Sequence, residues 1–302
     1  MFPIPLLVLV VLLSASPGRI AAAAERPFVV LSSSEIKAYQ DAVAGVREGL
    51  QGRRVVAYGL DGDPNRIPYV VNQLSLLSPK VVIAVGGLAI LALNSRPLDA
   101  QVVACLAIDD AHALDPSRSW VVSMYPAPRD VHAILQGFLP NHRIGIPHHP
   151  ERTGPTLRPT MEFFEQTPIR LVPIGVRSPE DLAPALAAAR ADIDALWIVP
   201  DASFLDTLSI EYLLRYSVVE RLPLIGYSDW LARSGGLFSM MPDYRDLGRQ
   251  AGELAIRINA GERPPHLQSA RNMKTFINLR VAKQFQILIN PALADLADRV
   301  YP

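Results

Sequence analysis

The sequence predicts an α/β protein in which two doubly wound, parallel-sheet lobes surround a cleft. Short, continuous apolar runs alternate with longer amphipathic segments, which is typical of parallel strands covered by helices on both faces. The alternation starts again after residues 119–126, and 302 residues are enough for two medium-sized domains. Because ligands bind at the carboxyl ends of such strands, we expect a site between the two sheets.

The first block of alternating elements covers residues 28–108. Its apolar runs, such as VVIAV before Gly86, have the length and the β-branched content of buried strands. Strands are expected at 28–31, 54–58, 80–85 and 101–108, and helices at 35–51, 67–77 and 86–94.

The second block repeats this order from residue 129 onwards. Strands are expected at 143–146, 169–173, 195–199 and 222–226, and helices at 129–138, 160–166, 179–190 and 204–215. The chain after residue 234 is too long for a tail. Two further strands are expected at 237–240 and 275–279, and a helix is expected at 244–260. A terminal helical stretch is expected to end near residue 300.

Charge and cysteine content exclude several functions. The 29 basic residues balance 29 acidic ones, so the net charge provides no electrostatic footprint for nucleic acid or for an anionic membrane surface. The single cysteine, Cys105, cannot form an internal disulfide. It lies within the apolar run VVACLA, which indicates a small buried hydrophobic side chain.

The N-terminal 24 residues resemble a secretory signal peptide. The apolar run PIPLLVLVVLL is followed by small residues and by four alanines, which predicts cleavage after Ala24. This run is too short to span a bilayer, which needs about 20 apolar residues. The segment before it has no Lys or Arg, and the alternative is a buried N-terminal strand. We expect no membrane span in the mature protein.

Three stretches in the second half of the chain carry a family resemblance. They are DALWIVPD at 194–201; PLIGYS at 223–228 with GGL, PDY and LGRQA at 235–237, 242–244 and 247–251; and INLRVAK at 277–283 with NP and LAD at 290–291 and 296–298. In order and spacing they resemble the ABC-transporter substrate-binding proteins with the type I periplasmic-binding fold. That family includes members that bind tryptophan and other aromatic amino acids.

This resemblance implies a periplasmic binding protein without a cofactor and not an enzyme. Such a protein captures a small, amino-acid-like ligand between its lobes by domain closure and docks on the membrane permease of an ABC importer. The resemblance also implies that the chain crosses back, so that lobe 1 comprises 25–122 plus 235–302 and lobe 2 comprises 123–234. The alternative is a periplasmic ligand-sensing or scaffold protein that signals to a membrane receptor.

Asp201 is the first candidate for ligand binding. It follows the apolar strand 195–199, so its carboxylate is expected at the carboxyl edge of the sheet. There it would pair with a ligand ammonium through a charge-assisted hydrogen bond. The alternative is an N-cap of a helix that begins near Ser203.

Small residues follow two strands of the first block. Ser33 and Ser34 end the first strand and offer hydroxyl groups to a ligand, although Ser32 and Glu35 have the spacing of a helix capping box. Gly86 and Gly87 leave backbone amides uncovered at a helix N-terminus, where carboxylates and phosphates bind. The alternative for these glycines is a tight strand-to-helix turn.

Five further residues are candidates for lining the cleft. Asp109 and Asp110 end the fourth strand, but adjacent residues point apart and no metal-ligand spacing accompanies them. Tyr125 and Tyr227 would form aromatic walls, or else pack in the hinge or core. Ser228 belongs to a segment, GYSDW, that resembles a nucleophile elbow but lacks its second glycine.

Metal binding by the adjacent His148 and His149 is a weaker alternative to a surface loop.

Overall fold

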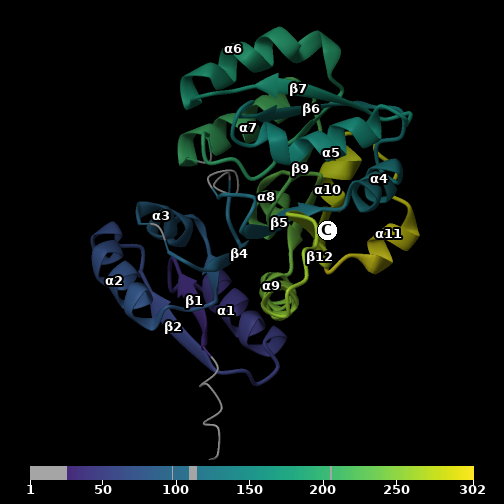
Figure 1. The fold of residues 1–302 in the computed structure, drawn as a ribbon. Coiled ribbons are helices and arrows are strands. Elements are labelled where there is room, and N and C mark those ends of the chain that lie inside the picture. The colour runs from purple at the N-terminus through teal and green to yellow at the C-terminus, as the bar shows by residue number, and fades with distance from the viewer. Residues whose placement is uncertain (1–25, 97, 109–113, 205) are drawn as a thin grey trace, which may run out of the picture.

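The computed structural model describes residues 26–96, 98–108, 114–204 and 206–302. It confirms the predicted fold class, because the chain forms two parallel-sheet α/β lobes, which lie one above the other in Figure 1. The predicted signal peptide, Asp109 and Asp110 lie outside the described residues. None of the described helices is both long and apolar enough to cross a membrane.

The first lobe contains a six-stranded parallel sheet in the order β11-β5-β4-β3-β1-β2. Apolar side chains alternate between its faces, so that α1 and α9 cover one face while α2 and α3 cover the other. The strands are β1 (Phe28–Ser32), β2 (Val55–Gly59), β3 (Val81–Val85), β4 (Gln101–Cys105), β5 (Ser119–Pro126) and β11 (Leu267–Ala270). The helices are α1 (Lys37–Gly49), α2 (Ile67–Leu77), α3 (Gly87–Ser95) and α9 (Tyr244–Asn259), with a 3-10 turn at Pro64–Arg66.

The second lobe contains a seven-stranded sheet in the order β13-β12-β10-β9-β8-β6-β7, in which only the β10–β12 pair is antiparallel. Its strands are β6 (Arg143–His148), β7 (Arg170–Gly175), β8 (Ala195–Trp197), β9 (Leu224–Gly226), β10 (Phe238–Pro242), β12 (Met273–Asn278) and β13 (Arg299–Tyr301). Its helices are α4 (Pro128–Gln136), α5 (Gly154–Phe164), α6 (Pro179–Ala189), α7 (Thr207–Val219), α8 (Asp229–Ser234), α10 (Leu279–Gln284) and α11 (Pro291–Leu296), with a 3-10 turn at Arg190–Asp192.

The C-terminal third is divided between the lobes, which corrects the expected assignment of 235–302 to lobe 1. Only α9 and β11 pack in the first lobe, whereas β10, β12 and β13 pair in the second sheet. The physical reason is the short α8, whose six residues return the chain beside β9, so that β10 continues the same sheet. The expected terminal helical stretch ends at Leu296 and is followed by strand β13.

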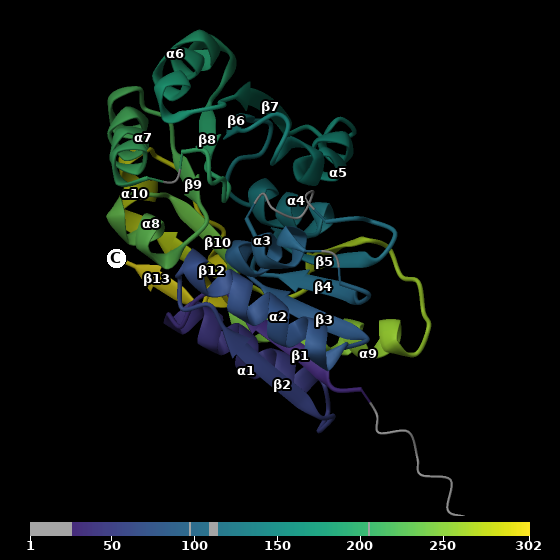
Figure 2. The same ribbon diagram turned by 60° about the vertical axis from the view of Figure 1, so that its left-hand side comes forward.

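Three crossings connect the lobes. Strand β5 pairs with β4 and β11 in the first sheet and then runs into the second lobe, where it contacts β10 (Figure 2). The other crossings join β10 to α9 and β11 to β12. Because these crossings are the covalent connections between the lobes, a hinge motion changes the backbone dihedral angles there.

Helices α1 and α9 pack with their backbones in contact. A Cβ atom added to Gly45 would overlap the carbonyl oxygen of Arg245, and one added to Gly248 would overlap that of Ala42. Gly49 and Gly252 approach the partner helix in the same way. These glycines fix α9 on the first lobe, although the chain enters this helix directly from a strand of the second lobe.

Cys105 lies in the core between these helices and the first sheet, as predicted. Burial raises the pKa of its thiol to about 12, so the thiol stays protonated and unreactive at neutral pH.

Candidate functional site

Ser33 and Gly86 come together at the carboxyl edge of the first sheet. The Ser33 hydroxyl accepts a hydrogen bond of 2.8 Å from the backbone N–H of Ala89, in the first turn of α3. Gly86 has φ = 93°, and a Cβ atom there would overlap the ring of Tyr39. The predicted anion site at Gly86 and Gly87 therefore has one of its helix N–H groups occupied by Ser33.

Ser34 lies beside an open pocket rather than in a capping box. Helix α1 begins at Lys37, later than expected, and Ser32 donates its hydroxyl proton to the Ser34 carbonyl at 2.9 Å. The predicted pairing of Ser32 with Glu35 as a capping box is therefore wrong. The pocket measures about 260 Å³ and is lined by Ser32, Ser34, Glu35, Gln40, Val43, Ala57, Tyr58 and Gly59.

Asp201 is fully buried between two loops of the second lobe. One carboxylate oxygen accepts the backbone N–H of His149 at 2.6 Å, and the other accepts that of Ser203 at 2.9 Å. The helix that follows begins at Thr207, with Asp206 as its N-cap. Asp201 is therefore not that N-cap; it joins the loop after β8 to the loop after β6.

Three tyrosines from separate segments are electrostatic neighbours in succession, Tyr227 of Tyr244 and Tyr244 of Tyr39. Burial raises the pKa of Tyr227 to about 12, and the neighbouring Tyr244 adds to the shift. Burial also raises the pKa of Tyr244, to which Tyr39 contributes. Tyr39 and Tyr244 stand in the first turns of α1 and α9, on the first lobe, whereas Tyr227 follows β9 on the second.

Neither Tyr39 nor Tyr244 is among the sequence-predicted site residues. Each stands at the start of a helix, immediately after a strand or strand loop, and that position is the signal that could have identified them.

Tyr125 lies in the crossing strand β5. Its hydroxyl donates a hydrogen bond of 2.6 Å to the Pro200 carbonyl, which links the crossing to the loop of Asp201. Tyr125 and Tyr227 both line a small apolar pocket, together with Met124, Pro126, Trp197, Val199, Pro200, Met240, Pro242 and Met273. A second pocket adjoins it and includes side chains of both lobes, among them Ala107 and Thr153.

Ser228 and the two histidines have structural contacts. The Ser228 hydroxyl caps α8 by accepting the Leu231 N–H at 3.2 Å. His148 is buried, with Nδ1 at 2.9 Å from the Ile146 carbonyl. Nδ1 of His149 accepts two backbone N–H groups of the turn before α5. Within the described part of the chain, no group of three or more His, Cys, Asp or Glu residues is placed to hold a metal ion.

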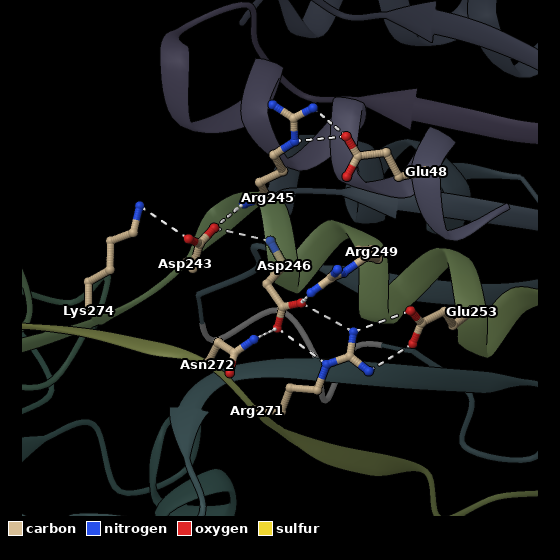
Figure 3. Close-up of polar contacts among 9 residues, drawn as sticks. All are labelled: Glu48, Asp243, Arg245, Asp246, Arg249, Glu253, Arg271, Asn272 and Lys274. Carbon is tan, nitrogen blue, oxygen red and sulfur yellow. Dashed lines mark hydrogen bonds and ion pairs between the residues drawn. The ribbon is translucent and has the colours of Figure 1, made fainter. Parts of the chain in front are cut away.

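A polar network surrounds two of the crossings, at the start of α9 (Figure 3). Asp243 caps α9 by accepting the N–H groups of Arg245 and Asp246. The Asp246 carboxylate is almost buried and accepts hydrogen bonds from Arg249, Arg271 and the Asn272 amide. Since Arg271 and Asn272 belong to the crossing from β11 to β12, this carboxylate holds that crossing against α9.

We expect Asp246→Asn to lower the free energy of unfolding at pH 7 by about 1–2 kcal/mol, since a charged hydrogen-bond acceptor is lost. Burial opposes ionisation of Asp246, but the hydrogen bonds from Arg271 and Arg249 outweigh it and lower the pKa. A carboxyl group with a lowered folded-state pKa stabilises the protein above its unfolded pKa and loses that effect as the pH falls through the folded value. Urea unfolding should therefore show the difference from wild type shrinking below about pH 4.

Glu262→Gln is the matched control for Asp246→Asn, because the exposed Glu262–Arg257 pair contributes little in solvent. Equal losses in the two variants would contradict a special role of the Asp246 network.

The model of the ABC transporter substrate-binding protein family matches residues 30–301. This chain belongs to that family. The family consists of solute-binding proteins and not of enzymes, in keeping with the capping role of Ser228. None of the curated protein sequences matches the chain significantly.

Several solved structures share this fold over nearly the whole length of the chain. A domain from Streptococcus pneumonia in complex with L-Trp has 18% identity and a TM-score of 0.64, over 92% of this chain and 100% of its own. A ligand-free, open substrate-binding protein with adhesive properties from Clostridium difficile has 14% identity and a TM-score of 0.66, over 91% and 99%. A conserved domain protein from Vibrio cholerae has 20% identity and a TM-score of 0.61, over 91% and 99%. At these identities the likeness establishes the fold alone.

Proposed function

We propose that this substrate-binding protein captures a small, amino-acid-like ligand between its lobes and delivers it to the permease of an ABC importer. The observation that carries the proposal is the group of Tyr39 and Tyr244 on one lobe and Tyr227 on the other. Partly buried phenol rings from both lobes provide apolar walls with polar ends, which suit a ligand with an apolar or planar side chain. The L-Trp complex of the streptococcal relative supports the same ligand class.

With tyrosines on both lobes, we propose that the lobes close on the bound ligand. A ligand that contacts both lobes stabilises the closed arrangement relative to the open one, and the crossings at β5, α9 and β12 absorb the change. Polar groups of the first lobe lie beside Tyr39, where Ser33 and Gly86 follow their strands. We propose Ser33, Ser34, Gly86, Gly87, Asp109, Asp110, Tyr125, Tyr227 and Ser228 as the cleft-lining set, with Tyr39 and Tyr244 added.

We further propose that the protein acts in the periplasm after export, with a mature chain that begins at or near Glu25. The apolar segment and the alanines that follow it support this location.

A cognate ligand is expected to stabilise the folded chain by about 2.7 kcal/mol when present at a hundredfold excess over its Kd. A thermal-shift screen should include the amino acids, small organic acids and amines, and sugars. We expect the aromatic amino acids to raise the melting temperature most, and Tyr227→Ala to abolish the rise. Tyr69→Ala is the matched control, because Tyr69 is exposed on α2, away from the proposed site. A panel without any stabilising compound would contradict ligand capture.

A further inference from the structure

The fold concentrates positive charge at one edge of the first sheet. In a parallel sheet, the residues that precede the strands share an edge. The backbone carbonyls of Arg54, Lys80 and Arg118 accept hydrogen bonds from the starts of neighbouring strands, at Phe28, Gln101 and Val102 respectively. These three basic residues therefore follow one another along the edge. Arg26 stands two residues before β1, and Lys80 also donates to the Asn259 carbonyl at the end of α9.

We define the basic edge as the charged residues at this end of the first lobe. Its cations are Arg26, Arg53, Arg54, Lys80, Arg96, Arg118, Arg257 and Arg263, and its carboxylates are Asp99, Asp115 and Glu262. Eight cations against three carboxylates leave an excess of five positive charges on a chain whose net charge is zero. The last turn of α1 adds one charge of each sign, Arg47 and Glu48, and does not change the excess.

In the second sheet, the residues that precede or begin the parallel strands β6, β7, β8 and β9 show no such excess. Four arginines before or at the start of these strands (Arg143, Arg170, Arg190 and Arg221) are matched by four carboxylates (Glu165, Asp192, Asp194 and Glu220). Two of these matches are ion pairs, Arg143–Asp194 at 2.8 Å and Arg190–Glu220 at 2.9 Å. Helix C-termini, which favour nearby cations, end at this edge in both lobes. The excess on the first lobe is therefore not a consequence of the fold.

The cations of the basic edge are accessible. All eight are exposed, and Arg26, Arg54 and Arg96 have no carboxylate partner among the residues that the structure describes. Arg26 and Arg96 line one pocket of about 350 Å³ together with Ser75, Ser78 and one carboxylate, Asp99. A guanidinium beside hydroxyl groups matches the oxygens of a phosphate group.

We propose that the basic edge is a docking surface for an anionic phospholipid membrane. The chain enters the first lobe at this edge, where Arg26 is the first basic residue after the expected cleavage site. Each lysine or arginine near an anionic bilayer surface contributes about 1 kcal/mol of attraction, so an excess of five cations at one edge is enough to hold the protein there at low salt. The opposite edge of this lobe carries four carboxylates (Glu35, Asp41, Asp61 and Asp63) against two cations, Lys37 and Arg66, which pair with Asp41 and Asp61. An anionic surface therefore orients the lobe with its ligand-side edge away from the lipid.

The test is co-sedimentation of the exported, full mature protein with vesicles of 30 mol% phosphatidylglycerol in phosphatidylcholine at low salt. The test variant is the double substitution Arg54→Glu with Arg96→Glu. The matched control is Arg170→Glu with Arg221→Glu, which makes the same change at the equivalent edge of the second lobe. Circular dichroism and melting verify that both variants fold.

Wild type should bind these vesicles, fail to bind pure phosphatidylcholine, and dissociate as salt rises from 50 to 300 mM. Removing two surface cations should weaken binding about thirtyfold, and their reversal more, whereas the control should stay within about twofold. Equal weakening in both variants, or no binding to anionic vesicles, would overturn the proposal. Tighter binding to duplex DNA would assign the surface to nucleic acid instead, and release by millimolar inorganic phosphate would reduce it to a small-anion pocket.

Discussion

Gly248→Ala is expected to lower the free energy of unfolding by about 3 kcal/mol or more. Gly248 lies where the backbone of α9 touches that of α1, and the added methyl group would overlap the carbonyl oxygen and carbon of Ala42. Neither neighbour is the flexible end of a side chain, so the two helices have to separate. Alanine favours a helix over glycine by up to about 1 kcal/mol, but this gain is smaller than the packing loss.

Chemical denaturation followed by circular dichroism measures this effect. Gly154→Ala is the matched control, since its added Cβ atom would meet only ordinary contacts at 3.6 Å or more, at the first position of α5. That variant should be neutral or slightly more stable. If Gly248→Ala is as stable as Gly154→Ala, the close approach of α1 and α9 is wrong, and with it the rigid attachment of α9 to the first lobe.

The alternation of apolar and amphipathic segments was sufficient to predict both lobes. Strands such as β1 and β3 are buried on both faces, and the helices between them carry one apolar face. The spacing of apolar residues therefore differs clearly between the strands and the helices. β11 was missed because its sequence, LQSA, is half-exposed at the sheet edge and has no apolar run. The pairing of β10 with β9 depends on the geometry of the short α8, and no sequence period encodes it.

The sequence places the candidate site residues relative to the strands but does not give their contacts. Ser33, Gly86 and Tyr227 each follow a strand directly. They are therefore expected at the carboxyl edges of their sheets, towards the region between the lobes. Hydrogen-bond partners depend on the path of neighbouring loops, so the contacts of Asp201 could not be inferred. Net charge likewise conceals where charges lie, and the basic edge becomes visible only when the sheet aligns the residues that precede its strands.

Asp201→Ala is expected to lower the free energy of unfolding by about 3 kcal/mol, because two buried N–H groups, of His149 and Ser203, lose their acceptor. Asp201→Asn should cost about 2 kcal/mol, since its amide NH₂ would face one of these donors. Asp206→Ala, which removes the N-cap of the next helix, serves as the control and should cost about 1 kcal/mol. Melting and calorimetric titration with a ligand from the thermal-shift screen separate folding from binding. Unchanged stability of the Asn variant, combined with affinity lowered tenfold or more, would instead show that Asp201 contacts the ligand directly.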